Sequence, residues 1–119
     1  MNIIGIGTDI VEFELIEKNV NNTFARKVLG EKEYDKFLQI TSQKSKTSYL
    51  ASRLAAKDAL LKAYGLPRGS GADYKVYEIL NDDNRRPYLS SSCTNLAHKV
   101  FISISNTSKF CSAYVVVTS

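Results

Sequence analysis

The sequence is poor in the residues that most often mark a disulfide framework, a zinc site or a nucleophilic enzyme. It contains two cysteines, Cys93 and Cys111, and a single histidine, His98. Two cysteines in a chain without an export signal are typically free and buried, so we expect neither a disulfide nor a zinc ion. A lone histidine in a polar stretch is more often structural than catalytic. The chain also has no nucleophile elbow, Walker loop or Rossmann fingerprint.

Long apolar runs are missing as well. No stretch reaches the roughly 20 residues that cross a membrane, and the first residues lack the charged and apolar regions of a secretory leader. We therefore expect a cytoplasmic protein with no membrane partner. A length of 119 residues with 44% hydrophobic and 24% charged side chains is typical of one soluble globular domain, here residues 1–119.

The formal net charge of +4 is modest, but the basic residues are unevenly distributed. They concentrate between Arg26 and Lys62, and again at Arg85 and Arg86. This distribution favours phosphate groups or an acidic partner, whereas isolated surface lysines are more simply interpreted as a solvated face.

The longest helical pattern covers residues 49–65, YLASRLAAKDALLKAYG. Alanine, leucine and long unbranched side chains favour a helix, and Gly65 followed by Pro67 is a plausible end. The helix would be roughly 24 Å long, enough to cross a small domain. Alanines form one stripe and leucines another, which leaves little purely polar surface and predicts burial.

Four charged residues in this helix conflict with its burial. Arg53 and Lys57 are a like-charge pair one turn apart, and Asp58 and Lys62 lie one turn apart between the apolar stripes. Buried charges are costly unless they are paired. The pattern therefore predicts that an anion binds near this helix.

The remaining segments predict an α+β domain with helices first and antiparallel strands later. Asp9 is expected at the end of the first strand, and residues 41–47 are expected to form a loop. Residues 90–98 are ambiguous. Helices are predicted at 10–19, 24–29 and 31–40, and strands at 2–8, 74–80, 87–89, 99–105 and 110–118, with 74–80 and 87–89 paired as a hairpin.

Asp9 and Asp58 allow two interpretations. If the fold brings the carboxylates together, they repel unless a cation lies between them, and Mg²⁺ typically takes one or two carboxylates together with water and phosphate oxygens. Lys62 would then reach the same phosphates. The alternative is that Asp9 caps a helix while Asp58 and Lys62 form a helix ion pair that contributes roughly 0.2–0.5 kcal/mol.

Four segments carry a resemblance to a known family. They are GIGTDIVE near the start, RLAAKDALLKAYG in the centre, a hairpin that ends in RPYL, and ISISNT before the last strand. Together they span residues 3–117 in the order and spacing of the holo-acyl-carrier-protein synthase family of 4′-phosphopantetheinyl transferases, which the chain resembles. Four collinear motifs are far more specific than any one of them.

The resemblance implies that 4′-phosphopantetheine is transferred from coenzyme A to a serine of apo acyl carrier protein, in fatty acid biosynthesis, with release of adenosine 3′,5′-bisphosphate. It implies an α+β fold with a long central helix on a small, mainly antiparallel sheet, and a homotrimer with active sites between subunits. Asp9 and Asp58 match the Mg²⁺ ligands, and Lys62 matches the lysine at the diphosphate; these three are the expected catalytic residues. Further positions that match coenzyme A contacts are Lys44, Arg53, Gly65, Pro87, Asn106 and Thr107.

Three positions depart from the family pattern. Asp58 stands where the family has glutamate, so it would bind the metal through water or require a shift of the helix. Replacement of Asp58 by glutamate is expected to preserve activity, unless the site is built around the shorter side chain. Asn106 replaces the histidine of the SISH motif and cannot act as a base.

The third departure concerns docking of the carrier protein. The first helix has Leu15 where an arginine is common, and glutamates precede it. We therefore expect docking either on Arg26, Lys27 and Lys32 instead or on a compensating surface of the carrier protein.

Two other functions are consistent with parts of the sequence. A non-enzymatic RNA-binding domain would explain the net positive charge and the seven tyrosines, but the chain lacks a strand motif that combines aromatic and basic residues. A degenerate homologue that binds coenzyme A without turnover would explain the changes at Asp58 and Asn106. The resemblance favours an active transferase that does not bind nucleic acid.

Overall fold

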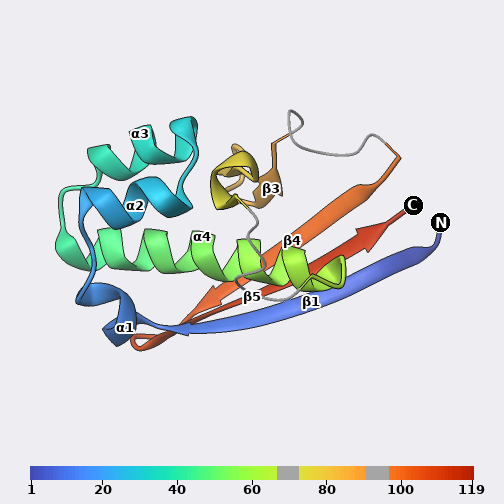
Figure 1. The fold of residues 1–119 in the computed structure, drawn as a ribbon, viewed down its shortest axis with the longest axis horizontal. Helices are drawn as coiled ribbons and strands as arrows, with labels where there is room; N and C mark the ends of the chain where they lie inside the picture. Colours follow the sequence, from blue (N-terminus) through green and yellow to red (C-terminus); the bar gives the residue numbers. More distant parts are fainter. Residues whose placement is uncertain (67–72, 91–96) are drawn as a thin grey trace.

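The fold was obtained as a computed structural model that describes residues 1–66, 73–90 and 97–119. Two short antiparallel sheets and one long helix organise the chain (Figure 1). The elements, in chain order, are β1 (Ile3–Glu12), α1 (Phe13–Glu17), α2 (Asn22–Val28), α3 (Glu31–Gln39), α4 (Gln43–Ala63), the 3₁₀ turn η1 (Tyr74–Val76), β2 (Ile79–Asn81), β3 (Pro87–Leu89), β4 (Lys99–Asn106) and β5 (Phe110–Thr118).

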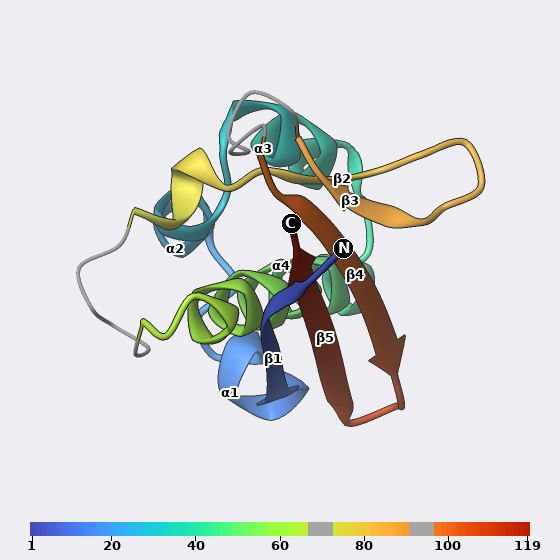
Figure 2. The same cartoon turned by 90° about the vertical axis from the view of Figure 1, so that its right-hand side faces the viewer.

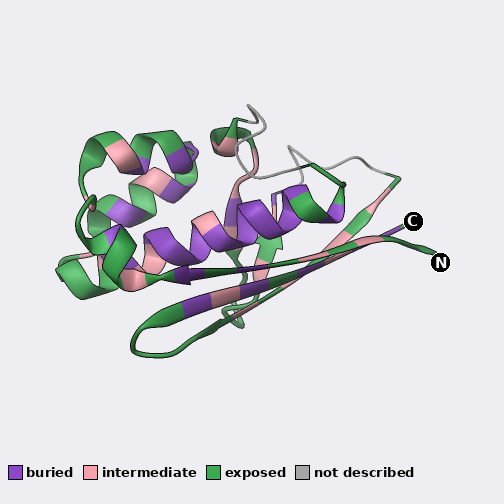
Figure 3. Cartoon of the chain, turned by 60° about the horizontal axis from the view of Figure 1, so that its bottom comes forward, coloured by how far each residue is buried: buried purple, intermediate pink, exposed green. Residues whose placement is uncertain are grey.

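The main sheet has the order β1-β5-β4, and both pairs of strands are antiparallel. Side chains alternate along β5, so that Cys111, Ala113, Val115 and Val117 are buried while Tyr114 between them is exposed. Helix α4 lies across the buried face of this sheet, and most of its surface is covered (Figure 3). The predicted α+β fold with a central helix on an antiparallel sheet is confirmed.

Two glycines bring β1 unusually close to α4. A Cβ atom on Gly5 would overlap the carbonyl oxygen of Ala63, and one on Gly7 would overlap that of Ala59. The small side chains of the alanine stripe complete the contact from the helix side. Strand and helix backbones therefore touch here, which fixes the position of Asp9 two residues farther along β1.

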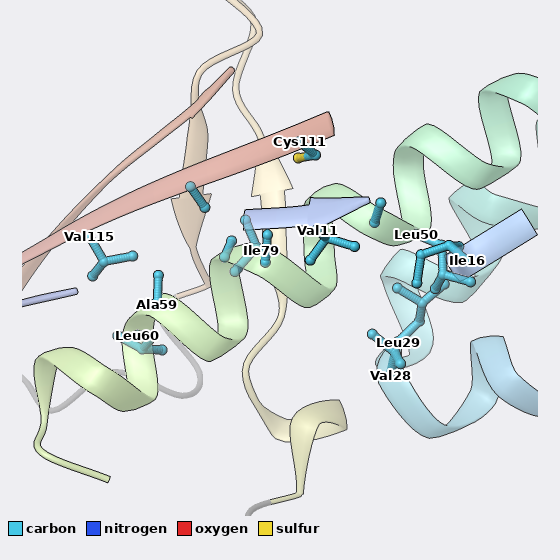
Figure 4. Close-up of a cluster of buried hydrophobic side chains, with 14 of the residues drawn as sticks. Val11, Ile16, Val28, Leu29, Leu50, Ala59, Leu60, Ile79, Cys111 and Val115 are labelled. Atoms are coloured by element: carbon cyan, nitrogen blue, oxygen red, sulfur yellow. The ribbon is translucent and has the colours of Figure 1, made fainter. Parts of the chain in front are cut away.

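The remaining helices and the hairpin also pack against α4. Helices α2 and α3 lie on the side of the helix that faces away from the main sheet, whereas the β2-β3 hairpin packs against α4 and lies beside β4 (Figures 1 and 2). Val28, Leu29, Leu50, Leu60 and Ile79 join the buried residues of β1 and β5 in one core (Figure 4). The prediction that Cys111 is a small buried residue is confirmed, and burial raises the pKa of its thiol to about 11.

Three predicted boundaries are wrong. Helix α4 begins at Gln43 rather than at residue 49, because the Ser42 hydroxyl accepts a hydrogen bond from the Ser45 amide (3.0 Å) and caps the helix. Lys44 therefore lies in the helix and not in a loop. Strand β1 continues to Glu12, so Asp9 is inside the strand and cannot cap a helix. The predicted helix at 10–19 is therefore shorter, because residues 10–12 belong to the strand and α1 covers only Phe13–Glu17.

The third error concerns residues 74–76, which form a 3₁₀ turn and not a strand. The strand begins only at Ile79, and its pairing with Pro87–Leu89 confirms the predicted hairpin. The predictions for α2, α3, β4 and β5 are confirmed to within two residues at each end. Pro67 and Cys93 lie outside the described residues, as does most of the segment at 90–98.

Candidate functional site

Asp9 is a buried carboxylate next to a lysine. It lies on the face of β1 that packs on α4, and only 4% of its side chain is exposed. The Lys62 ammonium group donates to the Thr8 carbonyl oxygen (2.9 Å) and lies 3.4 Å from Oδ1 of Asp9. The Lys62 side chain itself is 45% exposed, so it can also face a ligand in solvent.

Asp58 is the second buried carboxylate of the site. It is 2% exposed and precedes Lys62 by one helical turn, which places both on the same face of α4. Its Oδ1 atom accepts a hydrogen bond from the Tyr74 hydroxyl (2.7 Å). The contacts of Lys62 with Thr8 and Asp9 thus connect this helix face to β1, so the structure brings the three predicted catalytic residues together.

These residues suit a hard divalent cation. Among the described residues no three histidine, cysteine, aspartate or glutamate side chains form a metal cluster. Two carboxylates are nevertheless what Mg²⁺ uses when water and phosphate oxygens complete its coordination. The donor chemistry of Asp9 and Asp58 therefore fits Mg²⁺.

Lys57 does not face this site. Its ammonium nitrogen is fully buried and lies 2.6 Å from Oε1 of Glu33, and it also donates to the carbonyl oxygens of Val28 (2.6 Å) and Tyr74 (3.0 Å). Burial lowers the pKa of Lys57, and the Glu33 carboxylate opposes that effect. The anion that the sequence predicted near Lys57 is thus a residue of the chain itself.

Arg53 also uses its donors within the protein. It is 5% exposed, it stacks on the Tyr49 ring, and its Nε donates to the Ile79 carbonyl oxygen (3.1 Å). A second donor reaches the Asn81 side chain, and Asn81 pairs with Pro87 across the hairpin. Arg53 therefore joins α4 to the hairpin that carries Pro87, and this contact places both predicted coenzyme A residues in one substructure.

A second group of predicted residues lies at the other end of α4. A cavity of about 560 Å³ is lined by Lys44, Thr47, Ser48 and Thr107, among others. Asn106 donates to the Ser48 hydroxyl (3.3 Å) beside it. Lys44 and Lys62 share a face of α4 but lie about 27 Å apart along it, at a rise of about 1.5 Å per residue.

Gly65 and the predicted docking residues lie elsewhere. Gly65 follows the end of α4 with φ of 75°, a left-handed conformation that favours glycine. Arg26 and Lys27 are exposed on α2 and Lys32 is exposed on α3, and the Arg26 guanidinium stacks on the Tyr34 ring. The three basic residues thus occupy one helical layer, remote from the sheet (Figure 1).

Sequence reasoning missed two residues of this region. Glu33 lies four positions before the buried Phe37 on α3, and this spacing is the only signal that its carboxylate points inward. Tyr74 was assigned to a strand, and no local pattern indicates its contact with Asp58.

Comparisons with known proteins show the family and the fold of the chain. The family model of the 4′-phosphopantetheinyl transferase superfamily matches residues 5–118. A holo-[acyl-carrier-protein] synthase of Geobacillus is 38% identical over 117 residues, which cover 97% of this chain and 96% of that protein.

Solved structures give the same result. A holo-(acyl-carrier-protein) synthase from Bacillus anthracis in complex with CoA (3′,5′-ADP) superposes with a TM-score of 0.88 at 36% identity, covering 98% of this chain and 97% of that one. The synthase from Helicobacter pylori in complex with coenzyme A has a TM-score of 0.77 at 26% identity, covering 95% and 99%.

Proposed function

The chain belongs to the 4′-phosphopantetheinyl transferase superfamily, and on this premise we propose that it transfers the 4′-phosphopantetheine group of coenzyme A to a serine of apo acyl carrier protein. The serine hydroxyl gives up its proton to a base and its oxygen forms a new bond to the β-phosphorus, the phosphorus–oxygen bond to the nucleotide breaks, and adenosine 3′,5′-bisphosphate leaves. The observation that carries the proposal is the contact of Lys62 on α4 with Asp9 on β1, with the buried Asp58 one helical turn before Lys62 on the same face of α4.

Asp9 and Asp58 would hold Mg²⁺ in this site. A bound Mg²⁺ supplies Lewis-acid stabilisation of the charge that develops on the phosphate oxygens. The two carboxylates would hold the ion and offset its charge, and because both are buried, solvent would screen their attraction to it only weakly.

Lys62 supplies a cation for the diphosphate. Its ammonium group donates to the backbone of β1 at Thr8, while its side chain as a whole is 45% exposed. It can therefore donate to a phosphate oxygen without leaving Asp9. Electrostatic stabilisation by a positioned donor of this kind is often worth roughly 10²- to 10³-fold in rate.

The separation of Lys44 from Lys62 supports an oligomer with shared sites. The diphosphate and the 3′-phosphate of one coenzyme A molecule are much closer together than the roughly 27 Å between these lysines. One chain cannot use both groups on one ligand. We assign Asp9, Asp58 and Lys62 to one subunit of each site, and Lys44, Asn106 and Thr107 to a neighbouring subunit.

The outer face of the main sheet supports assembly into a trimer. Its exposed apolar side chains include Ile6 (68%), Ile10 (62%), Phe101 (53%) and Tyr114 (57%). Ile6 and Phe101 lie in one row across β5, because both pair with Val116. A continuous apolar face of this kind is typical of a surface that another subunit covers.

The remaining partner is an acidic carrier protein. Arg26, Lys27 and Lys32 form an exposed basic group on α2 and α3 that complements an acidic surface. None of the helices in the described parts of the chain could span a membrane. We place the reaction in the cytoplasm, where its coenzyme and carrier would be available.

A transfer assay tests the proposed function. The protein is incubated with coenzyme A, Mg²⁺ and an apo acyl carrier protein, and the carrier is weighed by mass spectrometry. We expect the mass of the carrier to increase by one phosphopantetheine group, and we expect no increase when the divalent cation is chelated. Calorimetric binding of coenzyme A without any product would contradict the proposal and identify a degenerate homologue instead.

A further inference from the structure

Two consecutive residues of α4 hold Tyr74 at both of its ends. The Lys57 ammonium group donates to the Tyr74 carbonyl oxygen (3.0 Å), and the Tyr74 hydroxyl donates to Oδ1 of Asp58 (2.7 Å). The turn that contains Tyr74 is closed locally, because the Asp73 carboxylate accepts from the Lys75 amide (3.1 Å). Both the backbone and the phenol of Tyr74 are thus placed relative to Asp58.

The anchor at the Tyr74 backbone is itself rigidly held. Lys57 is fully buried between Glu33 and the Val28 carbonyl oxygen. The second oxygen of Glu33 accepts a hydrogen bond from the Ile79 amide (2.9 Å), which ties the same network to β2. Tyr74 cannot move away from Asp58 without breaking its two partly buried hydrogen bonds, one of which is made by the fully buried Lys57 ammonium group.

Asp58 is the position at which this chain departs from the glutamate of its family. An aspartate carboxylate lies one methylene closer to the helix, and here the Tyr74 hydroxyl contacts that carboxylate directly. A glutamate would carry its oxygens about 1.5 Å farther, into the space that the Tyr74 hydroxyl fills. Asp58 is 2% exposed, so solvent offers no other room.

We infer that Tyr74 is a positioning residue for Asp58: its hydroxyl orients the shorter carboxylate toward the cation and occupies the space that a glutamate would need. The inference rests on the proposed function, because it assumes that Asp58 is a metal ligand. A hydroxyl that donates to a ligating carboxylate fixes the orientation of that carboxylate. Aspartate at position 58 and tyrosine at position 74 thus form one functional unit.

A double-mutant cycle tests this unit. The variants are Tyr74→Phe, which removes only the hydroxyl, Asp58→Glu, which restores the longer arm, and the combination of both. The matched control is Tyr77→Phe, since Tyr77 lies three residues on, is also half-buried, and has no hydrogen bond to Asp58 among the described residues. Mn²⁺ alone is the probe, and electron paramagnetic resonance counts the ion that stays free.

We expect Tyr74→Phe to weaken Mn²⁺ binding by about 10- to 100-fold, the usual effect of losing an outer-shell partner. Asp58→Glu should also weaken it, because the Tyr74 hydroxyl occupies the space that the longer side chain needs. The double variant should bind Mn²⁺ more tightly than either single variant, because removal of the hydroxyl makes room for glutamate. Transfer assays of the same proteins should show the same order. Tyr77→Phe should match the parent protein.

Two results would overturn the inference. One is Mn²⁺ binding by Tyr74→Phe that equals that of Tyr77→Phe. The other is a double variant whose loss is the simple product of the two single losses, as expected for independent sites. A merely structural role would lower the melting temperature of Tyr74→Phe without changing Mn²⁺ affinity.

The proposed function can fail separately from this inference. If the parent protein transfers no phosphopantetheine, the function is wrong, but the Mn²⁺ cycle still decides whether Tyr74 orients Asp58. If the parent protein is active and the cycle shows no coupling, only the role of Tyr74 is wrong.

Discussion

The ammonium nitrogen of Lys57 lies 2.6 Å from a carboxylate oxygen of Glu33, and neither side chain is exposed to solvent. This pair explains how a buried helix carries Arg53 and Lys57 one turn apart. Lys57 points to α2 and α3, whereas Arg53 points to the β2-β3 hairpin, so each cation has its own set of acceptors. Lys57 therefore connects α4 to α2 and α3, and Arg53 connects α4 to the β2-β3 hairpin, so the two side chains do not share one ligand.

Replacement of Glu33 by glutamine should destabilise the protein by about 3 kcal/mol, because it leaves a buried lysine without a counter-charge. Urea denaturation at fixed protein concentration measures the effect. The control is Glu31→Gln, an exposed residue of the same helix, which should cost less than about 0.5 kcal/mol. Equal stability of the two variants would contradict the importance of the pair.

The same variant should show a characteristic pH dependence. Burial lowers the pKa of Lys57 below its usual 10.5, so the unfolded chain binds more protons as the pH approaches that value from below. The stability contributed by this group therefore rises with pH in that window. We expect the loss in Glu33→Gln to shrink between neutral pH and about pH 10, measured by denaturation at each pH.

Replacement of Gly7 by alanine should separate β1 from α4. The new Cβ atom would overlap the Ala59 carbonyl oxygen, and backbone cannot rotate away as a side chain can. We expect a loss of about 3 kcal/mol in urea denaturation, at the upper end of the overpacking range. The control is Gly65→Ala, because a Cβ atom at position 65 would have no other atom within 4 Å. This variant should lose only about 1 kcal/mol of stability, the cost of placing an alanine in the left-handed conformation. A smaller loss of stability in Gly7→Ala than in Gly65→Ala would contradict the close approach of the β1 backbone to α4.

Replacement of Lys44 by alanine should raise the KM for coenzyme A about tenfold and leave kcat nearly unchanged. Loss of one charge-assisted contact in the cavity has this magnitude, and Lys44 is remote from the carboxylates. The control is Lys46→Ala, whose ammonium group lies over the Phe37 ring, 5.0 Å from its centroid. Steady-state kinetics should show no change in KM for that variant. A fall in kcat with KM unchanged would place Lys44 in a different role.

Subunit complementation tests the shared site. Asp58→Ala and Lys44→Glu should each be nearly inactive, but their co-expression should restore about one quarter of the parent activity. In a randomly mixed ring, one quarter of the sites combine an intact Asp58 with an intact Lys44 of the neighbour.

The control for complementation pairs Asp58→Ala with Lys62→Met. Both groups come from one subunit in the proposed arrangement, so every site of the mixed ring stays defective. Restored activity in this control, or none in the first mixture, would show that the sites are not shared in this way.

Much of the fold was predictable because it depends on local patterns. The alternation of β4 and β5 and the alanine-rich run of α4 follow from side-chain periodicity, and these elements agree with the prediction. The start of α4 was missed because the Ser42 cap is one hydroxyl in a polar segment. Residues 74–76 were misassigned because aromatic and β-branched side chains favour a strand, while Lys57 holds the Tyr74 carbonyl in a turn.

The sequence by itself determined the family and the α+β class, because motif spacing and side-chain periodicity are properties of the linear chain. It also predicts Asp9, Asp58 and Lys62 as the catalytic residues, and that assignment stays a prediction. Only the tertiary structure decided which partner each charged side chain of α4 contacts. In the fold, Lys57 forms an ion pair with Glu33, Lys62 donates a hydrogen bond to the Thr8 carbonyl oxygen, and Asp58 accepts one from the Tyr74 hydroxyl. These contacts join residues that are distant in the chain, and hydrogen bonds between buried groups depend on positions in space that no local pattern encodes.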